Sequence, residues 1–157
     1  NRTICILDTR GEALKRGLQA KPFMIKPNRE EIGELVERRL SRLEDLAGMA
    51  RSLREKYARL VVVSGGKEEV LVAGEGEILI LTPPYTRNLN PVGAGDALVG
   101  GFAVGLSRGT NLDEMAAMAV AAGAASVEKG REETLSLERI EELRKKVKCR
   151  RYSSTGI

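Results

Sequence analysis

The stretch NPVGAGDALVGGF, residues 90–102, does most to decide the fold of this chain. A proline-stiffened approach leads into Gly93 and Gly95, and the acid Asp96 then precedes an apolar segment. Glycine lets a backbone turn sharply and approach a ligand closely. The free N–H groups at a helix N-terminus bind anions. The stretch therefore predicts a tight turn into a helix whose first amides hold an anion, with phosphate the obvious candidate.

Asp96 admits two interpretations. A carboxylate repels phosphate, so the residue makes functional sense if it faces a hydroxyl that attacks the phosphate and accepts the proton of that hydroxyl. The structural alternative is an acid favoured by the helix dipole, with glycines present for packing. The chain has no histidine, so a general base would have to be a carboxylate, lysine, tyrosine or cysteine. Neither a Walker A loop nor a dinucleotide fingerprint is present.

Strand and helix signals alternate outward from this stretch. Apolar runs predict strands over residues 3–8, 22–27, 60–63, 69–73 and 77–81, and the last two read as a hairpin. Helical spacing predicts helices over 11–18 and from residues 28, 41, 94, 112 and 137. This order predicts an α/β fold: a mostly parallel sheet with helices on both faces and an antiparallel addition from the hairpin. We expect residues 1–157 to be a single nucleotide-binding portion, because no long linker is present.

Polar residues predict where several helices begin. Asn28 with Glu31, and Ser41 with Glu44, have the spacing of a capping box. Asn111 precedes another predicted helix in the same way, and the last helix would be capped by Ser136. For Asn28 and Glu31, the residues alone favour this structural role.

Composition excludes several function classes. Two cysteines are too few for a disulfide framework, and Cys5, in an apolar run, is predicted to be a core residue. Aromatic residues make up only 3%, which argues against a stacking platform for nucleic acid. No run approaches the roughly 20 apolar residues of a membrane span, and no signal-peptide pattern follows Asn1. We therefore expect a cytoplasmic location, no membrane partner, and, since no initiator Met is present, a fragment.

The net charge of +4 comes from the C-terminal region. Residues 139–151 contain seven basic and two acidic side chains. Basic residues are favoured near a helix C-terminus by its dipole, and this interpretation is preferred over a patch that binds nucleic acid.

The stretch 90–103 resembles the C-terminal signature of the ribokinase-like, PfkB-type carbohydrate kinases. The resemblance continues, in the family's order and spacing, at four further blocks: residues 4–9, 26–31, 64–66 and 121–125. The motifs Asp8-Thr9 and Lys26-Pro27-Asn28 most resemble those of the 1-phosphofructokinase and tagatose-6-phosphate kinase branch of the family. The resemblance implies a ribokinase-like fold, of which this chain is the C-terminal half, and ATP-dependent phosphorylation of a sugar, with a ketohexose phosphate favoured.

The resemblance also implies roles for individual residues. Asp96 would be the general base, and Gly93, Ala94 and Gly95 would form the anion hole. Asn28 and Glu31 would organise Mg²⁺ through water. The expected nucleotide-binding residues are Lys26, Asn28, Ser64, Gly66, Gly93, Gly95, Ala122 and Gly123. For Ala122 and Gly123, close helix packing is the structural alternative.

Three functions follow from these expectations. The first is a sugar kinase that uses ATP and Mg²⁺ on a sugar or sugar phosphate. The second is a nucleotide-binding module that is inactive without the N-terminal half, which would carry the sugar site and lid. The third, less favoured, is a nucleic-acid-binding domain that uses the basic C-terminal helix.

Overall fold

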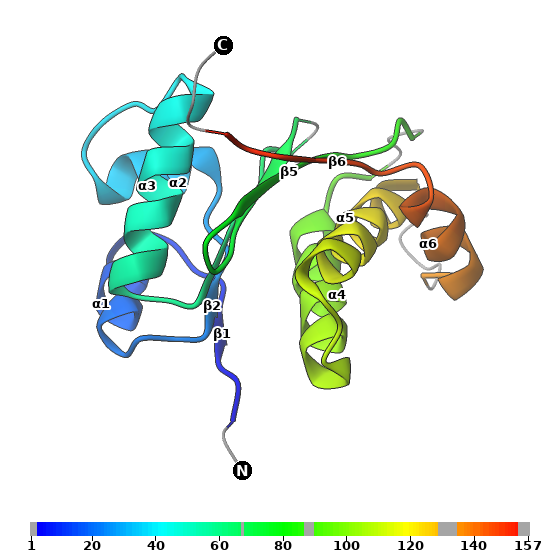
Figure 1. The fold of residues 1–157 in the computed structure, drawn as a ribbon, viewed down its shortest axis with the longest axis horizontal. Helices are drawn as coiled ribbons and strands as arrows, with labels where there is room; N and C mark the ends of the chain where they lie inside the picture. The colour runs from blue at the N-terminus through cyan, green and yellow to red at the C-terminus, as the bar shows by residue number, and fades with distance from the viewer. Residues whose placement is uncertain (1–2, 67, 87–89, 129–134, 154–157) are drawn as a thin grey trace. The chain divides into compact units, whose positions relative to one another are not determined.

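The structure, a computed structural model, describes residues 3–66, 68–86, 90–128 and 135–153. Its contacts divide the chain into two compact units, which are described separately. The first unit comprises residues 1–66, 70–80 and 151–157, and the second comprises residues 67–69 and 81–150. The elements, most of them labelled in Figure 1, are β1 (Ile6–Leu7), α1 (Gly11–Gln19), β2 (Met24–Ile25), α2 (Arg29–Leu35), α3 (Leu43–Lys56), β3 (Leu60–Val63), β4 (Val70–Ala73), β5 (Ile78–Thr82), α4 (Ala94–Arg108), α5 (Leu112–Glu128), α6 (Leu137–Arg144) and β6 (Lys148–Arg151).

The described strands form one mixed sheet in the order β1-β2-β3-β4-β5-β6. Strands β1, β2 and β3 are parallel, with Ile6 opposite Met24 and Met24 opposite Leu60. Strand β4 returns antiparallel to β3, with Val62 opposite Val72. Helical crossovers between parallel strands and a short return into β4 account for this mixture. The predicted α/β class and the predicted hairpin of β4 and β5 are confirmed.

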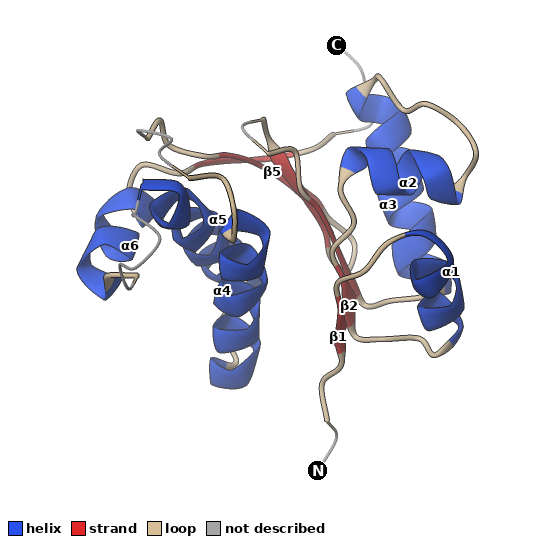
Figure 2. Ribbon diagram, turned by 180° about the vertical axis from the view of Figure 1, so that it is seen from behind, coloured by secondary structure: helices blue, strands red, loops and turns tan. Residues whose placement is uncertain are grey.

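Helices α1, α2 and α3 lie together on one face of the parallel strands (Figure 2). Alternate strand residues, such as Ile25, Val61 and Val63, point into this layer and are 0–1% exposed. They meet buried helix residues such as Leu14 and Leu53. Each such side chain contributes about 1.5–3 kcal/mol when it leaves water. Helices on this face are confirmed, and helices on the other face stay a prediction.

In the second unit, α4 and α5 form an antiparallel hairpin of helices in close contact. A Cβ built on Gly101 would lie 2.4 Å from the Cα of Ala119, and one on Gly105 would lie 2.4 Å from Cγ of Met115. The two backbones approach this closely because both positions lack a side chain. The predicted starts of α4, α5 and α6 are confirmed, as are the predicted caps of α5 and α6: Asn111 Oδ1 accepts from Glu114 N, and Ser136 Oγ accepts from Arg139 N.

Two local predictions are wrong. Cys5 is exposed, not part of the core, because β1 is the first strand of the sheet order and pairs only with β2. Ser41 does not cap α3: the N-cap is Arg42, which makes no side-chain cap bond. Ser41 lies one residue before the N-cap, so the helix begins one residue later than predicted. The carbonyl of Ser41 accepts a hydrogen bond of 3.1 Å from Nη1 of Arg29.

The C-terminal segment follows α6. Its described part contains β6, which follows β5 in the sheet order, and the amide of Tyr152 donates to the carbonyl of Ile78 at 2.8 Å. Among the described residues, no helix combines the length and the apolar character needed to cross a bilayer.

Candidate functional site

The turn at Gly93 opens α4 without a side-chain cap. Gly93 is the N-cap residue, in the left-handed conformation at φ 89° and ψ −3°. A serine or aspartate at an N-cap would accept from the amides of the second and third helical residues. Those amides belong to Gly95 and Asp96, and no side chain at the cap reaches them. The N-terminus of α4 therefore presents backbone donors and a positive dipole to an outside anion.

Hydrogen bonds within the turn and to α5 hold its backbone in place. The side chain of Asn90 accepts from the amide of Val92 at 3.1 Å, and the amide of Asn90 donates to the carbonyl of Val127 at 3.0 Å. The amide of Ala97 donates to the carbonyl of Gly93 at 2.9 Å and begins the regular helix. The turn is thus attached to the last turn of α5 by its backbone.

Small residues of α5 lie behind the turn. A Cβ on Gly123 would come within 3.3 Å of the carbonyl oxygen of Ala94, and one on Gly93 would lie 3.6 Å from Oγ of Ser126. Ser126 and Ala122 are only 3% and 5% exposed. The structure thus shows the packing role of Gly123; contact of Ala122 and Gly123 with a nucleotide stays a prediction.

Asp96 lies in the first turn of α4, and its side chain is exposed. Both features are required of a proton acceptor that must meet a substrate hydroxyl.

A second group of predicted residues follows the carboxyl ends of the parallel strands in the first unit. Asp8 follows β1, Lys26 follows β2 and Ser64 follows β3. Parallel strands end at one edge of a sheet, and ligands of open α/β sheets bind beyond that edge. The bridge between Asn28 and Ser64, with the amide of Ser64 donating to Pro27 at 3.1 Å, joins two of these loops.

Lys26 and Asp8 form an ion pair at this edge. Nζ of Lys26 lies 3.2 Å from Oδ1 of Asp8, and the lysine side chain is 9% exposed while the aspartate is 32% exposed. A buried ammonium needs a partner, and Asp8 supplies it. Asp8 is the more exposed member of the pair, and contact of Lys26 with a nucleotide stays a prediction.

Asn28 and Glu31 form the predicted capping box. The amide of Glu31 donates to Oδ1 of Asn28, and the amide of Asn28 donates to Oε2 of Glu31, both at 2.8 Å. The box uses one carboxylate oxygen of Glu31, and a carboxylate has two, each with spare lone pairs. Among the described residues, no group of three or more His, Cys, Asp or Glu is arranged around a metal position. This donor set fits a water-coordinated Mg²⁺ held from its outer sphere, and does not fit a metal held by protein ligands alone.

The chain was compared with known proteins. Residues 1–138 match the family model of the pfkB family carbohydrate kinases. The 1-phosphofructokinase of Bacillus subtilis is 33% identical over 77% of this chain. The ATP-dependent 6-phosphofructokinase isozyme 2 of Escherichia coli is 35% identical over 78% of it. The chain belongs to the pfkB family of carbohydrate kinases.

Solved structures agree with this membership. The phosphofructokinase-2 of Escherichia coli in complex with substrates and products superposes with a TM-score of 0.84, at 31% identity over 90% of this chain. That match covers 47% of the solved chain. The two curated relatives are covered over 40% of their length. This pfkB-family chain therefore spans less than half the length of each of these three relatives.

The structure brings the predicted site residues into two groups. Gly93, Ala94, Gly95, Asp96 and Gly123 lie together at the N-terminus of α4 in the second unit. In the first unit, Lys26, Asn28, Glu31 and Ser64 lie at the carboxyl edge of the parallel strands, where Gly66 is exposed in a turn with φ 66°.

Two residues near these groups were not assigned a role from the sequence. Asp8 was noted only for its resemblance, although its position after one strand and that of Lys26 after the next could have predicted the ion pair. Ser126 gave no signal, because a serine within a run of alanines resembles any other small helix residue.

Proposed function

We propose that this pfkB-family chain carries the phosphoryl-transfer part of an ATP-dependent sugar kinase, with a ketohexose phosphate as the favoured acceptor. The observation that carries the proposal is the uncapped glycine turn at Gly93, with Asp96 exposed in the helical turn that follows. Membership of a carbohydrate kinase family gives that turn its chemical context.

In this proposal, the α4 N-terminus acts on the transferred phosphoryl group. The amides of Gly95 and Asp96 donate to its oxygens and offset the negative charge that develops there. The Asp96 carboxylate accepts the proton of the acceptor hydroxyl as its oxygen bonds to phosphorus, and ADP leaves. Gly93 and Ala94 shape the turn. Ala122 and Gly123 would add a small apolar surface for the base of the nucleotide.

The carboxyl edge of the first unit would hold nucleotide phosphates and their metal. Lys26 supplies a positive charge, and its ion pair with Asp8 holds the ammonium group in position. Ser64 offers a hydroxyl, and the left-handed turn at Gly66 lets backbone approach closely. Asn28 and Glu31 orient water on Mg²⁺, which, when bound, neutralises phosphate charge.

The part of the relatives that this chain does not match would supply the sugar pocket. Strand β1 begins the sheet order, and Ile4, just before it, is 44% exposed. An open strand edge with apolar residues is a surface that another strand covers. The place of β1 in the sheet order and the exposure of Ile4 both support a whole protein in which an N-terminal half pairs with β1 and binds the acceptor.

Calorimetry of the folded chain with ATP and Mg²⁺ tests the nucleotide step. A phosphoryl-transfer assay with fructose 1-phosphate, fructose 6-phosphate and tagatose 6-phosphate then tests the chemistry. Binding together with transfer supports the kinase. A chain that is folded by circular dichroism and binds no ATP at millimolar concentration would overturn the proposal.

Binding without transfer would favour the second function, a nucleotide-binding module that needs its N-terminal half. The short span of the chain relative to its relatives supports this alternative. Joining the chain to that half should then restore transfer.

The nucleic-acid alternative loses its main support. Arg144 pairs with Glu141, Arg150 with Glu69, and Arg151 with Glu77. The carboxylates in these pairs neutralise part of the positive charge that would attract the phosphates of a nucleic acid.

A further inference from the structure

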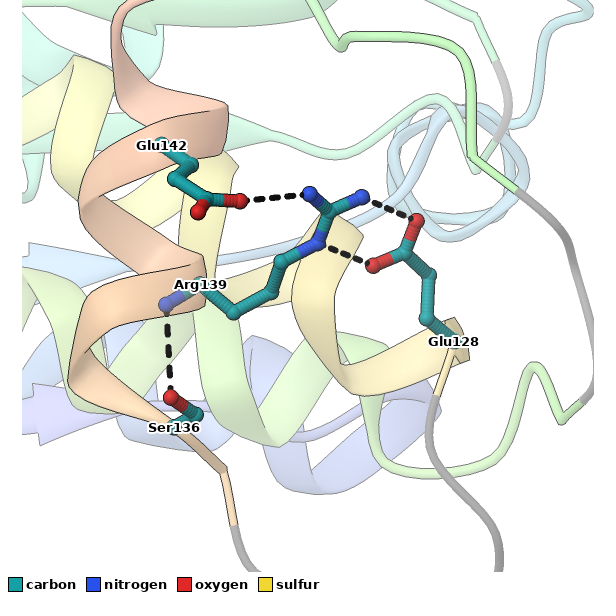
Figure 3. Close-up of polar contacts among 4 residues, drawn as sticks. All are labelled: Glu128, Ser136, Arg139 and Glu142. Carbon is teal, nitrogen blue, oxygen red and sulfur yellow. Dashed lines mark hydrogen bonds and ion pairs between the residues drawn. The ribbon is translucent and has the colours of Figure 1, made fainter.

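The last turn of α5 connects the glycine turn to a cluster of charged residues on α6. Arg139, in α6, donates from Nε to Oε2 of Glu128 at 2.7 Å and from Nη2 to Oε1 at 2.9 Å. Its Nη1 donates to Oε2 of Glu142 at 2.7 Å. Figure 3 shows the guanidinium between the two carboxylates, with Ser136 capping the backbone of the same helix.

Glu128 is the last residue of α5. The residue before it, Val127, accepts the hydrogen bond from the amide of Asn90, and Ser126 lies behind Gly93. Val127 and Glu128 therefore carry adjacent contacts, one to the glycine turn and one to Arg139, and Ser126 lies near the same turn. A two-bond contact between a guanidinium and a carboxylate fixes orientation as well as distance.

We infer that Arg139 is a positioning residue: by holding Glu128, it fixes the last turn of α5, and through it the amides of Gly95 and Asp96 at the N-terminus of α4. Its use in phosphoryl transfer rests on the function proposed above. The orientation of the turn, however, is a property of the chain and can be measured without any substrate.

The chain provides a matched control on the same helix. Arg144 makes two hydrogen bonds to Glu141, at 2.8 and 2.7 Å, as Arg139 does to Glu128. Both Arg144 and Glu141 belong to α6, so this pair does not connect two helices. Arg144→Gln therefore removes a comparable contact and an equal charge and breaks no hydrogen bond to the last turn of α5. The charge of Arg144 also acts on Glu114, which lies in the first turn of α5, at the opposite end from Glu128.

The first measurement is the amide spectrum of the ligand-free chain, with hydrogen exchange. Arg139→Gln should shift the amides of Gly95 and Asp96 and speed exchange at Asn90. Arg139→Lys keeps the charge and should restore part of the wild-type pattern. Arg144→Gln should leave these amides at their wild-type positions. If Arg139→Gln and Arg144→Gln behave alike at the turn, the inference is wrong.

The pH dependence of the amide shifts in the turn is a second measurement, and a loss of packing alone would leave it unchanged. The hydrogen bonds from Arg139 lower the pKa of the Glu128 carboxyl below its ordinary value of 4.5. A lowered pKa means that the contact is complete above that ordinary value and is lost as pH falls through the folded-state pKa. The turn amides should therefore keep their wild-type shifts to below pH 4.5. In Arg139→Gln, any response of these amides to titration of Glu128 should move to higher pH. In Glu128→Gln, that response should vanish.

Affinity for ATP with Mg²⁺ separates this inference from the function on which it rests. Arg139→Gln should weaken binding by about two- to fivefold, the effect of one partly exposed ion pair, and Arg144→Gln should not. If the wild-type chain binds no ATP while its turn amides still respond to Arg139→Gln, the proposed function fails and the positioning role stands. If ATP binds and neither the amides nor the affinity responds, the positioning role fails alone.

Discussion

Helices α2 and α4 begin in opposite ways. The N-terminus of α2 is closed by a capping box in which Asn28 and Glu31 exchange two hydrogen bonds of 2.8 Å. The N-terminus of α4 begins at a left-handed glycine with no side-chain cap, and its support comes from α5. A closed N-terminus satisfies its own donors and is stable locally. An open one leaves donors for a ligand, and depends on tertiary contacts to keep its shape. The four predictions that follow test this difference.

The largest effect is expected at Asp96. In a complete enzyme that contains this chain, Asp96→Asn should lower kcat by about 10²–10⁴-fold, the usual contribution of a general base. The affinity for ATP should change little, because the backbone amides of the turn stay in place. Steady-state kinetics together with calorimetry check both statements. Unchanged turnover would leave Asp96 as a helix-dipole residue, like any acid at a helix start.

The support of α4 is tested by a pair of adjacent glycines. Gly101→Ala places a methyl 2.4 Å from the Cα of Ala119 and should destabilise the chain by about 1–3 kcal/mol, as overpacking does. At Gly100, a Cβ meets nothing within 4 Å, so Gly100→Ala should stabilise it by about 0.5–1 kcal/mol through helix propensity. Urea denaturation measures both. Equal effects would mean that the close approach of α4 and α5 is not required.

The open turn is tested by glycines at the two ends of α4. Gly93 and Gly109 both have left-handed backbones, at φ 89° and 65°. Substitution of either by alanine should cost about 1–2 kcal/mol of stability through backbone strain. Only Gly93→Ala should also weaken binding of ATP. Thermal unfolding with and without ATP distinguishes the two variants. If the stabilisation by ATP falls equally in both, the result would contradict an anion site at Gly93.

The smallest effect is expected at the closed terminus of α2. Asn28→Ala removes one bond of the capping box and should cost about 1 kcal/mol of stability. Glu31→Gln keeps an acceptor for the amide of Asn28 and should cost less. If Glu31 also orients water on Mg²⁺, Glu31→Gln should weaken the dependence of ATP binding on Mg²⁺. Identical Mg²⁺ titrations of wild type and Glu31→Gln would make the box purely structural.

Patterns within a few residues predicted much of the fold. The β-branched run at 60–63 became β3, and the asparagine-glutamate spacing at 28–31 became a capping box. Both depend on groups close in sequence. The same reasoning failed at Ser41, which lies one residue before the N-cap of α3, and at Cys5, whose burial depends on which strands are its neighbours.

The sequence by itself determined that two glycines and an acid open an apolar helix, and that the family signature surrounds them. It determined the order of strands and helices from β1 to α6, because periodicity and caps are local, but it did not predict β6. Only the tertiary structure decided what each element contacts: the partner of Lys26 is Asp8, the support of Gly93 is the end of α5, and the partner of Glu128 is Arg139. These partners are separated by 11 to 33 residues along the chain, and their pairing depends on how helices and strands pack, which no short pattern records.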